Sequence, residues 1–374
     1  MTEYTNSTSK FTILSIPQLL ALLCEIALVI TSIYLPLYVY RLGAGEIIVG
    51  LVGGAQSITY IFMPFLAGKL SDRIGQAKLL FFGSATVLFT YSCYFFIFDP
   101  ILFIPFRAIE GLGWSFIWPS LEAILGADTS KLRIFNFMWG VGATLAPYAG
   151  GLIFQLTNVR NIFLTTSSLM FVSLASSLCL FRRINKADQE SDVRLDSVEI
   201  GEKKYLFLYL PFLYGFVHML MVTFFPIYSN SRNLSVIEVG YMLTVMNFGR
   251  LIAFAFPNSI KNVFGEKKTL ATSALLGCTL PTIVVFYNHA IVLYFELLFL
   301  GFFLGITYAI ALNKIMQMAG KRKGYYAGIF ESILGTGFFL GPMLGGATAA
   351  ITIEYVFFLP PILALPLLAL IIMS

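Results

Sequence analysis

The sequence predicts an all-α membrane protein whose twelve transmembrane helices form two pseudo-symmetric bundles of six. Hydrophobic residues make up 58% of the 374 residues and charged residues 11%, and the mean hydropathy is +0.84. A water-soluble fold cannot bury so large an apolar fraction. The apolar residues also gather in long segments, and the second half of the chain repeats motifs of the first.

The apolar segments are long enough to cross a bilayer. A helix needs about 20 residues to span about 30 Å of hydrocarbon. The sequence contains such segments at residues 12–38, 46–67, 77–98, 100–125, 132–156, 161–181, 205–228, 236–257, 268–288, 290–313, 324–350 and 354–373. The connections between most of them are short, which favours antiparallel neighbours.

An internal repeat relates the two halves. Pro36-Leu37-Tyr38 recurs 190 positions later as Pro226-Ile227-Tyr228. The pattern from Gly142 to Gly151 recurs, after a slip of five residues, from Gly337 to Gly346. Membrane transporters that open a central site to alternate sides are often built from such repeats. The repeat therefore predicts a duplicated architecture.

The polar segment around residues 182–204 separates the halves. It is rich in Asp, Glu, Lys and Arg and has no apolar periodicity, which is typical of a solvated linker. We therefore expect an N-terminal six-helix bundle at 1–181, a cytoplasmic linker at 182–204 and a C-terminal six-helix bundle at 205–374.

Basic residues predict the orientation. Arg41, Arg160 and Arg232 alone lie in the loops on one side, whereas the other basic residues outside the spans lie on the opposite side. Because cytoplasmic loops carry the excess of Lys and Arg, both termini are expected in the cytoplasm.

Three motifs resemble those of the major facilitator superfamily. Gly68-Lys-Leu-Ser-Asp72-Arg73-Ile-Gly75 resembles the loop between its second and third spans, and Arg107-Ala-Ile-Glu110-Gly111 resembles the arginine motif of its fourth span. The Gly142–Gly151 pattern is similar to a motif of drug–proton antiporters in that family. The resemblance implies a secondary transporter that works by alternating access.

The chain departs from these motifs at three points. Gln76 and Ala77 stand where the family usually has a basic pair, and Ala146 replaces a glycine of the fifth span. The antiporter-like motif also recurs on the eleventh span. It therefore also fits a packing feature of both halves, which weakens an inference of antiport.

The resemblance implies a cytoplasmic latch in the loop after the second span. Its candidate residues are glycines, which allow a tight turn, and charged residues, which can pair across it. Glu122 of the fourth span is included because it lies within reach of Arg73. The candidates are Gly68, Asp72, Arg73, Gly75, Lys78 and Glu122. The alternative is a plain basic turn.

Ionisable residues inside spans are candidate sites for proton coupling or substrate binding. The candidates are Glu25, Arg107, Glu110, His218 and Glu296. Glu25 and Arg107 reach the same level, roughly 20 Å from the cytoplasmic side at about 1.5 Å per residue. We expect Glu25 to take up a proton with Arg107 as its partner and Glu110 as a second acid, since burial and a nearby cation act on a carboxyl group in opposite directions. The alternative is a static polar cluster.

Two further sets concern gating and packing. Arg250 and Glu331 lie at one lower level and form a possible ion pair. Small residues on the fifth and eleventh spans allow close approach between bundles, and their prolines allow bending. These inter-bundle residues are Gly142, Pro147, Gly151, Gly337, Gly341, Pro342 and Gly346.

These features predict a secondary active transporter for a small solute in a cell membrane, with protons and the lipid bilayer as partners and a monomeric state. We favour efflux of an amphipathic or hydrophobic compound, because of the antiporter-like motif and the 37 Phe and 19 Tyr residues. An uptake permease or an uncoupled uniporter for a small metabolite is the alternative, and a non-transporting membrane sensor is a remote one.

Other activities find no support in the sequence. The four cysteines lie inside apolar runs without metal-ligand spacing, and the two histidines lie far apart. No phosphate-binding GxxxxGK[ST] motif occurs, so no nucleotide site is expected. We predict no enzyme activity, no cofactor, no metal and no nucleic-acid partner.

Overall fold

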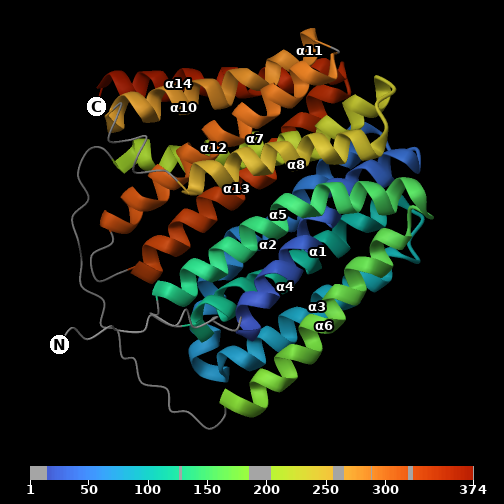
Figure 1. The fold of residues 1–374 in the computed structure, drawn as a ribbon, viewed down its shortest axis with the longest axis vertical. Coiled ribbons are helices and arrows are strands. Elements are labelled where there is room, and N and C mark those ends of the chain that lie inside the picture. The colour runs from blue at the N-terminus through green and yellow to red at the C-terminus, as the bar shows by residue number, and fades with distance from the viewer. Residues whose placement is uncertain are drawn as a thin grey trace, which may run out of the picture.

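The computed structural model describes residues 15–125, 129–184, 204–255, 265–287, 289–318 and 323–373, and every regular element in these ranges is helical (Figure 1). The first half contains α1 (Ile16–Arg41), α2 (Glu46–Ile74), α3 (Gln76–Tyr94), η1 (Pro100–Leu102), α4 (Phe103–Leu125), α5 (Thr129–Leu156) and α6 (Asn161–Ile184). The second half contains α7 (Lys204–Ser231), α8 (Val236–Ala255), α10 (Glu266–Thr279), η2 (Leu280–Thr282), α11 (Ile283–Phe286), α12 (Ala290–Met318), α13 (Lys323–Ala349), η3 (Ile353–Phe358) and α14 (Leu359–Met373).

The helices follow the twelve apolar segments, three of which are divided between elements, and residues 100–125 begin as η1 and continue as α4. Within the described residues, 10 helices are long and apolar enough to cross a membrane. The ninth segment changes from α10 to the short helix η2 at Pro281, because proline lacks the N–H that an α-helix needs there. The last segment begins as η3 and continues as α14.

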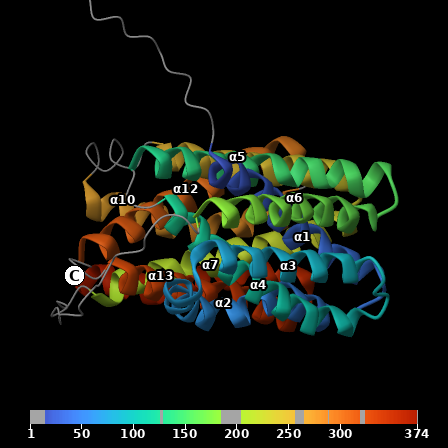
Figure 2. The same ribbon diagram turned by 90° about the horizontal axis from the view of Figure 1, so that it is seen from below.

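The helices pack as two groups, α1–α6 and α7–α14, which we call the N bundle and the C bundle. In Figure 1 the blue-to-green helices lie together, as do the yellow-to-red ones, and in Figure 2, seen from below, the two groups overlap. The groups meet where α2 packs on α13, α5 on α8 and α1 on α7. Residues 185–203 of the expected linker lie outside the described residues, and the boundaries at 181 and 205 stay a prediction.

Equivalent glycines of the repeat have equivalent roles. Gly75 and Gly265, which precede α3 and α10, have φ angles of +91° and +80°. A Cβ at either would meet no atom within 4 Å. A side chain at either position would therefore have room, and the role of these glycines is conformational, since only glycine adopts this φ without strain. Gly111 of α4 and Gly301 of α12 pack directly against the backbone of an equivalent helix in their own bundle, α2 and α8 respectively.

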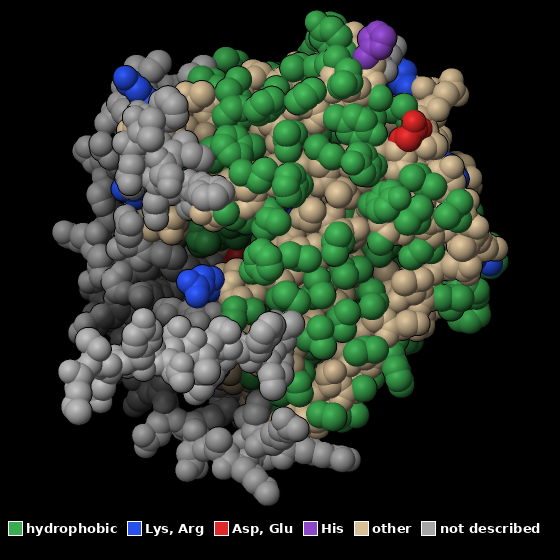
Figure 3. Space-filling model, in the orientation of Figure 1, with side chains coloured by type: hydrophobic (Ala, Val, Ile, Leu, Met, Phe, Trp, Pro, Cys, Tyr) green, Lys and Arg blue, Asp and Glu red, His purple; other side chains and the backbone are tan. Residues whose placement is uncertain are grey.

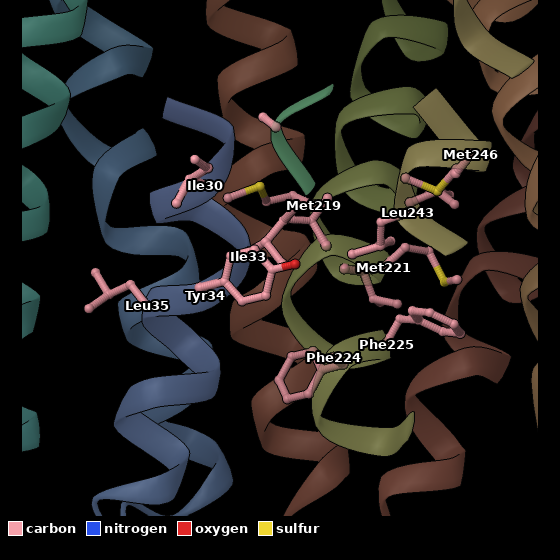
Figure 4. Packing of buried hydrophobic residues seen from close by; sticks show 14 of the residues in the cluster. Ile30, Ile33, Tyr34, Leu35, Met219, Met221, Phe224, Phe225, Leu243 and Met246 are labelled. Carbon is pink, nitrogen blue, oxygen red and sulfur yellow. The ribbon is translucent and has the colours of Figure 1, made fainter. Parts of the chain in front are cut away.

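The interface between bundles is closed at one end. We call the end where α1 begins and α14 ends the terminal end, and the end where α1 meets α2 the far end. Towards the far end, a Cβ at Gly346 would lie 3.1 Å from the Cα of Gly50, and one at Gly240 would lie 2.6 Å from the carbonyl oxygen of Pro147. Figure 4 shows Tyr34 of α1 pointing towards α7 and α8, whose apolar side chains fill the same region.

The surface differs towards the terminal end. Figure 3 shows a face dominated by hydrophobic side chains, as a surface in contact with lipid requires. Left of centre, on the side of the terminal end, this face is hollowed between the bundles, and an acidic side chain is visible in the hollow.

Only some of the predicted inter-bundle glycines lie between the bundles. Gly151 faces the carbonyl of Val236 across the interface, and Gly346 faces Glu46 and Gly50. The prediction is wrong for Gly142, Gly337 and Gly341. Their nearest neighbours are Leu22 and Glu25 of α1 for Gly142, and Phe212 and Phe216 of α7 for the other two. These glycines let α5 and α13 approach the central helix of their own bundle.

Candidate functional site

Arg107 and Glu110 form a buried ion pair inside the N bundle. Both side chains are fully buried, and Nη1 of Arg107 lies 2.8 Å from each carboxylate oxygen of Glu110. Tyr91, Tyr94 and Trp114 also donate to this carboxylate, at 3.0, 2.7 and 3.1 Å. Arg107 Nε donates to the carbonyl of Val52 at 3.3 Å. We call this set the Glu110 cluster.

The predicted pair of Glu25 and Arg107 is therefore wrong. Glu110 lies one turn along the same helix from Arg107, which places the carboxylate beside the guanidinium without any contribution from α1. The face of α4 that carries both residues is turned towards α2 and α3, into its own bundle. Equal depth in the membrane did not imply contact.

Glu25 faces the interface between the bundles instead. Its side chain is 4% exposed, and its Oε2 has no hydrogen-bond partner among the described residues. The Trp139 indole of α5 is a hydrogen-bond partner of the carboxyl group, and the cation whose charge acts on it is Arg250 of α8. An acid of the N bundle thus lies opposite a base of the C bundle.

Arg250 is held by aromatic side chains. Its Nη1 donates to the hydroxyl of Tyr214 at 2.9 Å, and its guanidinium lies 5.3 Å from the centre of the Trp139 ring. Tyr214 stacks on His218 with ring centres 5.5 Å apart and 6° between the planes. We call Glu25, Trp139, Arg250, Tyr214 and His218 the seam cluster, because it joins the two bundles.

The predicted ion pair of Arg250 and Glu331 is also wrong. Glu331 of α13 accepts a hydrogen bond from Tyr60 of α2 at 3.3 Å, which is a second contact between bundles. Arg250 contacts Tyr214 and Trp139 instead. Two residues at one level were separated by the direction in which each side chain leaves its helix.

Tyr308 of α12 connects the seam cluster with the Glu331 region. Its ring centre lies 4.9 Å from that of Tyr214 and 5.2 Å from that of Phe330. Charges on Glu331, Glu122 and Arg250 all act on its hydroxyl. Glu122 lies at the protein surface, so this region combines aromatic walls with two acids.

Glu296 stands apart from these groups. It lies on α12, is 4% exposed, and neither carboxyl oxygen has a hydrogen-bond partner in the described part of the chain. A buried carboxyl group without a partner is rare, because an uncompensated buried charge is very costly.

The predicted latch can be placed only in part. Gly68, Asp72 and Arg73 belong to the last turns of α2, but their side chains lie outside the described residues, as does any contact of Arg73 with Glu122. Gly75 and Lys78 stand at the start of α3. The latch stays a prediction.

The far end is closed by polar contacts between bundles. Arg41 Nη2 donates to Asn230 Oδ1 at 3.0 Å, and the Ile237 amide donates to Gln155 Oε1 at 3.0 Å. The Tyr148 amide donates to Thr244 Oγ1 at 3.2 Å. Gln155 thereby satisfies an amide at the N-terminus of α8 that would otherwise lack a partner within the helix.

Sequence reasoning missed several of these residues. Trp139, Tyr214 and Tyr60 lie in apolar runs, where an aromatic residue indicates packing. One signal was available: Trp139 lies one turn before Gly142 of the fifth-span motif, and Tyr214 lies one turn before His218. Trp139 and Tyr214 both belong to the seam cluster, beside Glu25 and His218.

Two helical bundles that meet at a polar seam, closed at one end and hollowed towards the other, define a multi-pass membrane transporter. The sequence model of the Major Facilitator Superfamily matches residues 19–260 and 212–374. The chain belongs to this superfamily, so it is an integral membrane transporter for small molecules and not an enzyme.

Relatives and solved structures agree with this assignment. The quinolone resistance protein NorA of Staphylococcus aureus (strain COL) is 25% identical over 338 residues, which cover 86% of this chain and 85% of NorA. Multidrug resistance protein 2 of Bacillus subtilis (strain 168) is 22% identical over 339 residues, with 82% and 81% covered. The crystal structure of the nucleoside transporter NupG shares the fold, with a TM-score of 0.79 and 12% identity over 95% of this chain and 98% of that one.

Proposed function

We propose that the protein exports a small amphipathic compound in exchange for protons. The observation that carries this proposal is the position of Glu25, a buried and incompletely paired acid that faces Arg250 across the interface between bundles. Any change in the angle between the bundles changes the distance between these two groups. Movement of one bundle relative to the other would therefore change the protonation equilibrium of the Glu25 carboxyl group.

Alternating access follows from the closed far end. With both termini in the cytoplasm, as the basic residues predict, the far end faces outwards and the hollow of Figure 3 faces the cell interior. This arrangement is the state that receives a compound from inside. To release it outside, the contacts Arg41–Asn230 and Gln155–Ile237 must break.

The proton step uses the seam cluster. A carboxyl group favours its ionised form beside a cation and its neutral form when the cation moves away in an apolar environment. Movement of Arg250 away from Glu25 therefore favours uptake of a proton by this carboxyl group, and its return favours release of the proton. Trp139 orients the carboxyl group for this exchange.

The binding region for the compound is the space around Tyr60, Tyr308, Phe330 and Glu331. Aromatic walls offer apolar contact area, and the carboxyl groups of Glu331 and Glu122 offer polar contacts. The resistance proteins among the relatives support efflux of such a compound.

The test uses purified protein in vesicles that contain a pH-sensitive dye. A panel of aromatic amphipathic compounds is added, and compound-dependent proton movement is recorded. Glu25→Gln is expected to abolish the dependence of transport on the pH gradient. Glu46→Gln, which changes an acid at the start of α2, is the matched control and should transport as the unmodified protein does.

The outcomes separate the alternatives. Unchanged gradient dependence in Glu25→Gln rejects the proton role of Glu25. Transport of a compound that never responds to a pH gradient, even in the unmodified protein, indicates an uncoupled uniporter instead.

A further inference from the structure

The internal repeat relates the two sides of the interface between the bundles. On one side α5 packs on α8, and on the other side α13 packs on α2. A Cβ at Gly151 of α5 would lie 3.0 Å from the carbonyl oxygen of Val236. A Cβ at Gly346 of α13 would lie 2.7 Å from the carbonyl oxygen of Glu46, the residue equivalent to Val236 in the repeat. The main chains of the two sides therefore meet in the same way at the far end.

The α5–α8 side has two hydrogen bonds between the bundles. Gln155 Oε1 accepts a hydrogen bond from the Ile237 amide at 3.0 Å. Thr244 Oγ1 accepts one from the Tyr148 amide at 3.2 Å. Each bond joins a side chain of one bundle to the main chain of the other. Separating α5 from α8 at the far end therefore breaks both bonds.

The α2–α13 side lacks the side chains that such bonds need. The repeat places Ala350 at the position of Gln155 and Gly54 at the position of Thr244. Neither residue has a side chain that can accept a hydrogen bond. In the described part of the chain, no hydrogen bond joins the far ends of α2 and α13. The two sides thus share a backbone arrangement but differ in their polar contacts.

The other contacts between the bundles do not compensate for this difference. Tyr60 of α2 donates to Glu331 of α13 at 3.3 Å, but Glu331 lies roughly 22 Å from Gly346 along the helix, at about 1.5 Å per residue. The bond between Arg41 and Asn230 joins α1 to α7 and so belongs to neither side. At the far end, the α5–α8 side is therefore the more strongly held of the two.

We propose that the far end opens in a fixed order, in which α2 separates from α13 before α5 separates from α8. A neutral hydrogen bond changes an equilibrium about fivefold, so opening the α2–α13 side alone is the less costly step. The first path from the interior to the far side then runs between α2 and α13. This inference rests on the outward opening in the proposed function, but not on the exchange of protons.

Ala350→Gln tests the order, because it gives the α2–α13 side an acceptor. Ala350 and Gln155 are both exposed. Ile47 is the second residue of α2, where the amide has no partner within its own helix. The new side chain can therefore accept from Ile47 as Gln155 accepts from Ile237. Ala350→Leu is the matched control, because leucine is similar in size to glutamine but has no acceptor.

The opening is measured by double electron–electron resonance on the full-length protein in lipid nanodiscs. One pair of spin labels replaces Leu156 and Ile237, and the other replaces the equivalent residues of the repeat, Ile351 and Ile47. The four native cysteines are replaced by alanine, so that only the chosen sites are labelled. Every sample also carries Arg41→Ala, which removes the contact that belongs to neither side and raises the open fraction.

We expect the fraction of molecules with the longer distance to be at least about fivefold larger for the α2–α13 pair than for the α5–α8 pair. Ala350→Gln should lower the α2–α13 fraction about fivefold, whereas Ala350→Leu should leave it unchanged. Equal fractions for the two pairs, or equal effects of the two substitutions, overturn the order and leave the proposed function intact. If neither pair shows a longer distance, the far end does not open, and the order is rejected together with the outward opening.

Hydrogen–deuterium exchange on the unmodified protein repeats the test without any substitution. The segments compared are residues 337–349 of α13 and residues 142–154 of α5, which are equivalent in the repeat. We expect the main-chain amides of the α13 segment to exchange faster, because this side separates more often. Equal exchange, or faster exchange in the α5 segment, overturns the proposal.

Discussion

Two buried acids, Glu110 of the N bundle and Glu296 of the C bundle, have opposite surroundings. In the N bundle, Glu110 accepts hydrogen bonds from Arg107, Tyr91, Tyr94 and Trp114, so its charge is fully compensated. In the C bundle, Glu296 is equally hidden from solvent, but neither of its oxygens has a partner among the described residues. Both are glutamates inside a span, and the sequence does not distinguish them.

The hydrogen-bond partners of a buried acid, and not its burial alone, decide whether it can change its charge. A fully compensated carboxylate is a structural element, because moving its partners would cost several interactions at once. An acid with an open position, such as Glu296 or Glu25, can change its charge or its partner at lower cost. The Glu110 cluster therefore belongs to the rigid interior of the N bundle, and Glu25 remains the group that we propose for the proton step.

The largest expected effect is on the Glu110 cluster. Glu110→Ala leaves Arg107 as an uncompensated buried charge, which should lower the free energy of unfolding by about 3–5 kcal/mol. The measurement is thermal unfolding of the purified protein, together with the fraction that elutes as a folded species. Replacing both residues, as in the pair Arg107→Met and Glu110→Leu, should recover most of the loss. A single variant as stable as the unmodified protein would show that the cluster is not structural.

A smaller effect is expected for a polar contact that joins the bundles. Gln155→Leu removes the acceptor of the Ile237 amide, which should shift the balance towards an open far end by about 1 kcal/mol, or about fivefold. Spin labels at the far ends of α5 and α8 report the distance between the bundles. Thr157→Val, two residues further along the chain, removes a hydroxyl that bonds only its own bundle and serves as the control. Equal distance distributions in the two variants would contradict the gating role of Gln155.

The smallest effect is expected at Glu296. Because this carboxyl group has no partner to lose, Glu296→Gln should change the free energy of unfolding by less than about 1 kcal/mol. Thermal unfolding under the conditions used for Glu110→Ala gives the direct comparison. A loss as large as that of Glu110→Ala would mean that Glu296 has an essential partner and that the contrast between the bundles is wrong.

Much of the fold could be predicted from the sequence, because apolar length and internal repetition are local signals. The helices follow the predicted segments, and Gly75 and Gly265 occupy equivalent turns with the same unusual backbone angle. The superfamily predicted from the Gly68–Gly75, Arg107–Gly111 and Gly142–Gly151 motifs is confirmed by the match across the chain.

The partners of the buried charges could not be predicted from depth alone. Depth along a helix follows from counting residues, whereas the direction of a side chain depends on how its helix is rotated against its neighbours. Counting residues therefore pairs Arg107 with Glu25, whereas its actual partner is Glu110. It likewise pairs Arg250 with Glu331, whereas Tyr214 and Trp139 contact Arg250. Aromatic hydroxyl and indole groups supply many of the actual partners, and an apolar run hides them.

The close approach of Gly50 to Gly346 has a consequence for how the molecule moves. At that point the main chains of α2 and α13 are in direct contact. Separating the bundles there does not require a long side chain to leave a pocket in the other bundle. We therefore expect this contact to add little to the energy barrier for opening or closing the interface. The proposed binding region lies elsewhere, so substitutions there leave this contact between the main chains unchanged.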